Sequence, residues 1–133
     1  MAKRKTKLFI SGPMTGMPHY NAENFNRYAE MARKLGYRVV NPVEMAHKIG
    51  LSKVLSDKKT FQKLVEAELK AVKASDAILM LDWWQNSVGA KKELRVALGV
   101  GLDVKLQHDI EMEWLNFERV PFLSKAKKST RRA

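Results

Sequence analysis

Two apolar stretches, Lys7-Leu8-Phe9-Ile10-Ser11 and Asp76-Ala77-Ile78-Leu79-Met80-Leu81, decide the fold. Each is short and apolar, which is typical of a strand that is buried on both faces. Each is followed by a loop and then by a segment with apolar residues at helical spacing. This alternation predicts βαβ units and a parallel sheet.

The other expected elements continue the alternation. Asn21 is a suitable N-cap for a helix that Gly36 ends, and Pro42 closes an expected strand. Residues 43–56 predict a loop or a short helix, and residues 108–123 are ambiguous, with a helix favoured over 110–117. The remaining expected elements are helices over 60–75 and 87–99 and strands over 37–41 and 103–106. The fold class is therefore α/β, a small doubly wound parallel sheet of the flavodoxin or Rossmann kind, with four to five strands flanked by helices.

The chain has 133 residues, which suits one domain, and we expect that domain over residues 8–123. Most of the formal net charge of +11 lies outside it, in tails over 1–7 and 124–133 that contain no acidic residue. We expect both tails to be disordered. Such tails often contact nucleic acid without sequence preference, but they also simply keep a protein in solution, and both interpretations stay open.

Several classes of site are excluded by composition. The sequence has no cysteine, so it forms no disulfide and no thiolate metal site, which suits a reducing cytoplasm. No apolar run approaches the roughly 18 residues that span a bilayer, and the basic start is not followed by the apolar segment of a signal peptide. His19, His47 and His108 lack metal-ligand spacing, so we expect no metal and no other cofactor.

Two carboxylates lie on apolar helix stripes. Glu93 belongs to the stripe of Ala90, Leu94, Ala97 and Leu98, from which Lys91, Lys92 and Arg95 point away. Glu68 belongs to the stripe of Phe61, Leu64, Val65, Leu69 and Val72. A carboxylate that faces a core is costly unless it is paired or used, and paired acids in a partly dry crevice cleave glycosidic bonds. The alternative is that each glutamate sits at the edge of its stripe and reaches solvent.

Two loops could contact a ligand at the carboxyl ends of the strands. Gly12 and Gly16 follow the first strand, although a tight turn explains them equally well. The segment Asn86–Ala90 opens the helix of Glu93, so its free N–H groups suit a phosphate or a hydroxyl, while Ser87 is also an ordinary N-cap. Trp83 and Trp84 follow the third strand, where they either stack on a base or pack in a core.

Two signatures resemble a phage and prophage family of unknown function that is grouped with the nucleoside 2-deoxyribosyltransferases. The first runs from Phe9 to Asn21 and continues through Phe25 and Gly36-Tyr37 to Val40-Asn41-Pro42. The second contains Ser75-Asp76-Ala77-Ile78, Trp84, Ser87, Gly89, Ala90 and Glu93-Leu94. The resemblance covers about residues 7–106 and implies cytoplasmic action, in the host cytoplasm if the protein is phage-encoded.

This resemblance implies catalytic and substrate-binding residues. Glu93 matches the nucleophile that attacks the anomeric carbon, and Glu68 matches an acidic position that is usually aspartate. Ser87 and Gly89 match residues that hold the sugar or its 5′-phosphate. The expected substrate-binding residues are Ser11, Gly12, Pro13, Met14, Thr15, Gly16, Tyr20, Asn41, Trp84, Ser87 and Gly89. The resemblance also implies a homodimer or a larger homo-oligomer.

Three hypotheses follow. The first is an enzyme, a transferase or an N-glycosidase, that cleaves or exchanges the N-glycosidic bond of a nucleoside or nucleoside 5′-monophosphate. The second is a nucleotide-binding module that is catalytically weak or inactive. The third is association with nucleic acid through the basic tails, which is compatible with either of the others.

Overall fold

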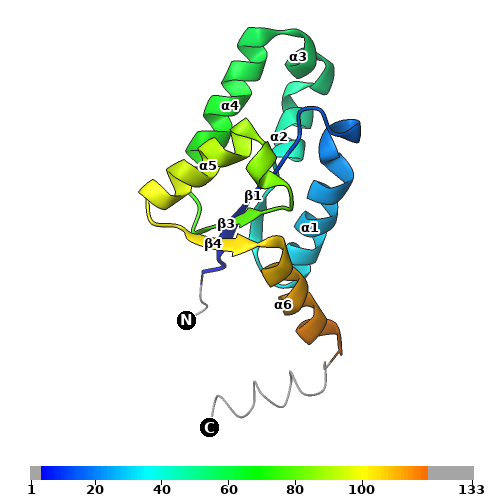
Figure 1. Ribbon diagram of the computed structural model, residues 1–133, viewed down its shortest axis with the longest axis vertical. Helices are drawn as coiled ribbons and strands as arrows, with labels where there is room; N and C mark the ends of the chain where they lie inside the picture. Colours follow the sequence, from blue (N-terminus) through cyan, green and yellow to red (C-terminus); the bar gives the residue numbers. More distant parts are fainter. Residues whose placement is uncertain (1–3, 120–133) are drawn as a thin grey trace.

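The computed structural model describes residues 4–119, and these form a four-stranded parallel sheet in the order β2-β1-β3-β4 (Figure 1). The strands are β1 (Lys7–Ser11), β2 (Arg38–Val40), β3 (Ala77–Met80) and β4 (Asp103–Leu106). The register places Phe9 of β1 between Val40 of β2 and Ile78 of β3. Helices cover both faces of the sheet, so the predicted doubly wound α/β fold is confirmed, with four strands.

The two central strands supply the core with alternate side chains. Leu8 and Leu79 pack in one layer with α1 (Ala22–Lys34) and α6 (Gln107–Arg119). Phe9 and Ile78 pack in the other layer with α4 (Lys58–Lys73) and α5 (Val88–Gly99). All four side chains are fully buried, which accounts for the continuous apolar character of both strands. Within residues 4–119, no helix combines the length and the apolar character that crossing a membrane requires.

The segment over residues 43–56, for which a loop or a short helix was expected, belongs to two helices. Helix α2 (Pro42–Ile49) begins where the Asn41 side chain accepts a hydrogen bond of 3.0 Å from the N–H of Val43. Pro42 therefore starts a helix as well as ending the strand. Gly50, with a φ of 114°, separates α2 from α3 (Leu51–Ser56). The two helices pack on α4 around a cluster of Ala46, Val54 and Leu64.

The loop after β1 ends in an unusual backbone turn. It contains the short helix η1 (Pro18–Asn21), and His19, Tyr20 and Asn21 have φ values of 50°, 56° and 61°. Asn21 stands at the N-cap position of α1, but its side chain makes no cap. Its amide instead donates a hydrogen bond of 3.0 Å to the Pro13 carbonyl, which ties the two ends of the loop together.

Two further details differ from the sequence expectations. Leu98, which was assigned to the apolar stripe of its helix, is 61% exposed, because α5 passes beyond the edge of the sheet near its end. Helix α6 begins at Gln107, directly after β4 and before the favoured start at 110. A second short helix, η2 (Trp84–Asn86), links β3 to α5.

The expected tails lie only partly within the described residues. Arg4 forms an ion pair of 2.8 Å with Asp76, and Lys7 begins β1, so the structure places residues 4–7 against the domain. The remainder of the N-terminal tail, residues 1–3, lies outside the described residues. The expected C-terminal tail over 124–133 and the last four residues of the expected domain also lie outside them.

A substitution at Gly12 tests how closely the loop after β1 approaches the end of β3. A Cβ at Gly12 would lie 2.9 Å from the Cβ of the buried Leu81, so Gly12→Ala requires the backbone to shift. We expect it to lower the free energy of unfolding by about 1–3 kcal/mol. Gly99→Ala is the control, because a Cβ there meets nothing within 4 Å, and it should be neutral or slightly stabilising. Urea unfolding of both variants measures this, and equal stabilities would contradict the packing.

Candidate active site

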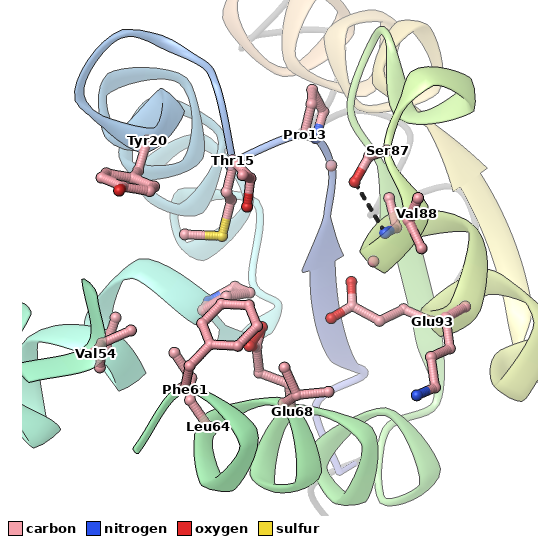
Figure 2. Close-up of a pocket in the computed structure, with 18 of the residues that line it drawn as sticks. Pro13, Thr15, Tyr20, Val54, Phe61, Leu64, Glu68, Ser87, Val88 and Glu93 are labelled. Atoms are coloured by element: carbon pink, nitrogen blue, oxygen red, sulfur yellow. Dashed lines mark hydrogen bonds between the residues drawn. The ribbon is translucent and has the colours of Figure 1, made fainter. Parts of the chain in front are cut away.

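A cavity of about 560 Å³ lies beyond the carboxyl ends of the strands. One wall is the loop after β1, another is α4 together with α2 and α3, and the third is the start of α5 (Figure 2). Its size is within the range of small-molecule sites, and its walls are mostly apolar with a few polar groups, as such sites usually are.

Glu93 projects from α5 into this cavity (Figure 2). The hydroxyl of Ser11, the last residue of β1, donates a hydrogen bond of 2.6 Å to Oε1 of Glu93. Ser11 itself is fully buried, so this hydrogen bond connects the end of a central strand to the carboxyl group. Burial raises the pKa of Glu93 to about 7, and the hydrogen bond from Ser11 opposes that rise because it favours the charged form.

Glu68 enters the same cavity from α4 and is only 8% exposed. Its burial, and after it the negative charge of Glu93, raise the pKa of Glu68 to about 9. The two carboxyls titrate as a coupled pair. Between about pH 7 and pH 9, this pair therefore carries one proton, held mainly by Glu68, and one negative charge, held mainly by Glu93. That is the division of roles needed by a nucleophile and a proton donor.

The helix stripes bring the two glutamates together. Leu64, Glu68 and Val72 follow one another at intervals of four residues, and all three are buried. On α5, the small residues Ala90 and Ala97 are buried against the sheet. Helices α4 and α5 lie side by side on the same face of the sheet (Figure 1). The carboxyl groups of Glu68 and Glu93 therefore meet between the two helices.

The start of α5 forms a polar edge of the cavity. The Ser87 hydroxyl accepts a hydrogen bond of 3.1 Å from the N–H of Ala90, which caps the helix (Figure 2). The N–H groups of the first turn, at Val88 and Gly89, have no carbonyl of the helix to bind. Both residues line the cavity, so these donors and the positive end of the helix suit an anionic or hydroxyl group of a ligand.

The end of the cavity across from Glu93 is apolar. Tyr20, Val54 and Phe61 lie there (Figure 2), and residues of α2 and α3 extend the wall. Phe61, which was expected to face the core, is 46% exposed because it borders this space. Sequence reasoning missed the contribution of α2 and α3. The available signal was the helical spacing of Leu51, Val54 and Leu55, which follow a glycine.

The structure brings most of the expected site residues onto the cavity wall. Glu93, Glu68, Gly12, Pro13, Met14, Thr15, Tyr20, Ser87 and Gly89 all line it. Ser11 lies behind Glu93 and acts on it through the hydrogen bond. Lys92 also lines the cavity, which the sequence analysis did not predict.

Besides Ser11, three further expected substrate-binding residues do not line this cavity. Asn41 is buried, caps α2 and donates a hydrogen bond of 2.9 Å to Asn26, so its polar atoms are used within the fold. Trp84 packs against the core layer that contains Phe9 and Val72. Gly16 supplies a turn with a φ of 83° and has no atom near its Cβ position. In the described part of the chain, no three side chains of histidine, aspartate or glutamate are grouped as metal ligands.

Comparison with protein families places the chain in a family that has no assigned function. Residues 6–106 match the model described as a domain of unknown function, DUF4406, and the chain belongs to this family. The matched residues include both glutamates, the first loop and the start of α5. None of the curated proteins with which the chain was compared matches it.

The raised pKa of Glu68 predicts a specific dependence of stability on pH. The unfolded chain releases this proton near pH 4.5, whereas the folded protein holds it up to a pKa of about 9. The folded state therefore binds more protons in this window, and the free energy of unfolding falls as pH rises through it. Glu68→Gln mimics the protonated carboxyl, so its stability should be flat between pH 7 and 9, whereas the wild type should lose roughly 2 kcal/mol over the same range.

The control for this experiment is Glu66→Gln, which removes an exposed carboxylate from the same helix. Its pH dependence should follow that of wild type. Denaturant unfolding at a series of pH values measures all three proteins. Parallel curves for wild type and Glu68→Gln between pH 7 and 9 would mean that Glu68 is already ionised in the folded protein.

Proposed function

We propose that this protein cleaves or exchanges the N-glycosidic bond of a nucleoside or nucleoside 5′-monophosphate, with Glu93 as the nucleophile. The observation that carries the proposal is the pair of buried carboxyls that share a proton at one side of an apolar cavity. Burying two like charges is costly, and a module that only binds a nucleotide has no need of them. The pair therefore favours an enzyme over a binding module.

The sequence resemblance supports the same chemistry. Members of the phage and prophage group noted above are related to nucleoside 2-deoxyribosyltransferases, and Glu93 matches their nucleophile by position. On this basis we also propose a phage or prophage source, action in the host cytoplasm and assembly as a homodimer or larger oligomer. Sedimentation of the purified protein measures the last point directly.

The proposed reaction has two steps. In the first, a carboxylate oxygen of Glu93 attacks C1′ of the sugar, and the bond from C1′ to the base nitrogen breaks with its electron pair on the base. Glu68 donates its proton to the leaving base. In the second step, the ionised Glu68 accepts a proton from water or from a second base, which attacks C1′ and releases Glu93. Water gives hydrolysis, and a second base gives transfer.

In the proposed reaction, each part of the substrate has its own region of the cavity. The nucleophile must approach C1′ from the face opposite to the base, so the base lies across the cavity from Glu93, near Tyr20 and Phe61 (Figure 2). The sugar then lies beside Glu93, close to Ser87 and Gly89. The N–H groups at the start of α5 suit its 5′-hydroxyl or 5′-phosphate.

Replacing Glu93 tests the nucleophile. We expect Glu93→Ala and Glu93→Gln to lower kcat by roughly 10³-fold or more, because the covalent step is lost. Release of free base is measured by chromatography with ribo- and deoxyribonucleosides and their 5′-monophosphates, with and without an acceptor base. The Glu66→Gln control should keep wild-type turnover.

Two results of this experiment would contradict the proposal. Undiminished turnover by Glu93→Ala would exclude Glu93 as nucleophile. Ligand-induced stabilisation of the wild type without any product would favour the nucleotide-binding module instead.

A substitution at Ser11 tests whether its hydrogen bond lowers the pKa of Glu93. Removing its hydroxyl in Ser11→Ala takes away a hydrogen bond that favours the charged form, so the pKa of Glu93 should rise. The acidic limb of the pH profile of kcat/KM should therefore move to higher pH. Ser75→Ala is the matched control, since it removes another buried hydroxyl, one bonded to the Ala71 carbonyl away from the cavity. If the acidic limb of kcat/KM lies at the same pH in the wild type, Ser11→Ala and Ser75→Ala, the ionisation of Glu93 does not determine that limb.

A further inference from the structure

A second chamber continues from the apolar end of the cavity. It has a volume of about 280 Å³. Five residues line both spaces, namely Thr15, Tyr20, Val54, Leu55 and Phe61. The chamber adds Ser56, Asp57 and Lys58, from the junction of α3 and α4. Tyr20, Val54 and Phe61, which border both spaces, lie across the cavity from Glu93 (Figure 2). A group bound between Tyr20 and Phe61 therefore has further space beside it.

Two of the polar side chains at the far side of the chamber, Ser56 and Asp57, already make hydrogen bonds within the protein. Asp57 caps α4, with hydrogen bonds of 3.3 Å from the N–H of Lys59 and 2.6 Å from the Thr60 hydroxyl. The Ser56 hydroxyl donates a hydrogen bond of 2.8 Å to the Ser52 carbonyl. Neither side chain is free to recognise a polar ligand without losing these contacts. The apolar side chains of Val54, Leu55 and Phe61 line the same space and can contact an apolar group.

The wall formed by Tyr20 is held in place from behind. Tyr20 lies in the run of three left-handed residues, a conformation that is costly outside glycine and persists only where the surroundings impose it. Asn21 imposes it, because its buried amide binds the Pro13 carbonyl, and Asn24 donates a hydrogen bond of 2.8 Å to its Oδ1. Tyr20 thus stands as a fixed side of the passage between the two spaces.

We propose that the second chamber receives an apolar substituent on the leaving base, so that the substrate class is nucleosides or nucleotides with alkylated bases. This inference rests on the proposed function, because the attack by Glu93 directs the base toward Tyr20 and Phe61. The edge of the base that faces away from the sugar then points into the chamber. A purine carries that edge at C6 and a pyrimidine at C4, so a chain attached to the exocyclic nitrogen at either position enters the chamber.

Equilibrium binding to the full-length Glu93→Gln variant tests the proposal without turnover. The ligands are adenosine 5′-monophosphate and its N6-hexyl derivative, and 2′-deoxycytidine 5′-monophosphate and its N4-hexyl derivative. We expect at least one hexyl compound to bind about tenfold or more tightly than its own parent, because its chain leaves water for an apolar chamber. Equal or weaker binding of both hexyl compounds would overturn the proposal.

Filling the chamber with a tryptophan side chain tests whether the hexyl chain binds there. Ser56 lines the chamber but not the cavity of the two glutamates, so Ser56→Trp should abolish the gain from the hexyl chain and leave the binding of the parent compound unchanged. Ser52→Trp places the same bulk one turn earlier on α3, outside both spaces, and should keep the gain. Lys58→Trp is a second blocking variant if Ser56→Trp melts below the wild type. A gain that survives in the folded blocking variant would also overturn the proposal.

The failure of this inference differs from the failure of the proposed function. A tenfold gain from the hexyl chain without base release by the wild type would leave the chamber as a binding site and contradict the glycosidic reaction. Base release from the parent compounds with no gain from either hexyl chain would support the glycosidic reaction and contradict the proposal for the chamber.

Discussion

The hydrogen bond of 2.6 Å between the Ser11 hydroxyl and the Glu93 carboxylate joins the end of the central strand to α5. It supplies a donor to a carboxylate that is largely removed from water, and so it supports a negative charge where burial opposes one. Burial raises the pKa of Glu68 on the neighbouring helix, and the charge of Glu93 raises it further, because two like charges in one dry cavity repel. The division of the pair into one anion and one acid depends on this contact.

The fold provides the rigid support for that pair. Ser11 closes a strand that is hydrogen-bonded on both sides, and Glu93 lies on a helix whose buried alanines seat it on the same sheet. Helices α2 and α3 add a feature that the sheet alone does not supply. They form the apolar half of the cavity, opposite the carboxyls, and separate the chemical end from the end that would select a substrate. In the proposed reaction, the chemical step and the recognition of the substrate would therefore fall to different elements of the fold.

The strands and the two glutamates could be predicted from the sequence because both follow from simple periodicity. A short continuous apolar run favours a buried strand. A carboxylate at the centre of an apolar stripe is costly to bury, so its presence there indicates a function. Residues 42–56 were harder, because short helices with mixed faces give a weak pattern, and the proline after Asn41 is equally consistent with the end of a strand and the start of a helix. Lys92 shows a further limit: periodicity gives the direction of a side chain from its helix, not the shape of the space beside it. Asn41 and Trp84 each follow a strand in the sequence, which is why they were expected in the site. In the structure Asn41 caps α2, and Trp84 packs against the core.

A covalent glycosyl-enzyme on Glu93 would be the most direct evidence for the account. The wild-type protein is mixed with the nucleosides and 5′-monophosphates that carry a 2′-fluorine, which slows breakdown of such an ester, then quenched in acid and digested for mass spectrometry. The account predicts that the mass of the sugar moiety is added to the peptide that contains Glu93, and that Glu93→Gln gains no such mass. A sugar attached to another residue, or release of base with no attached sugar at any quench time, would contradict it.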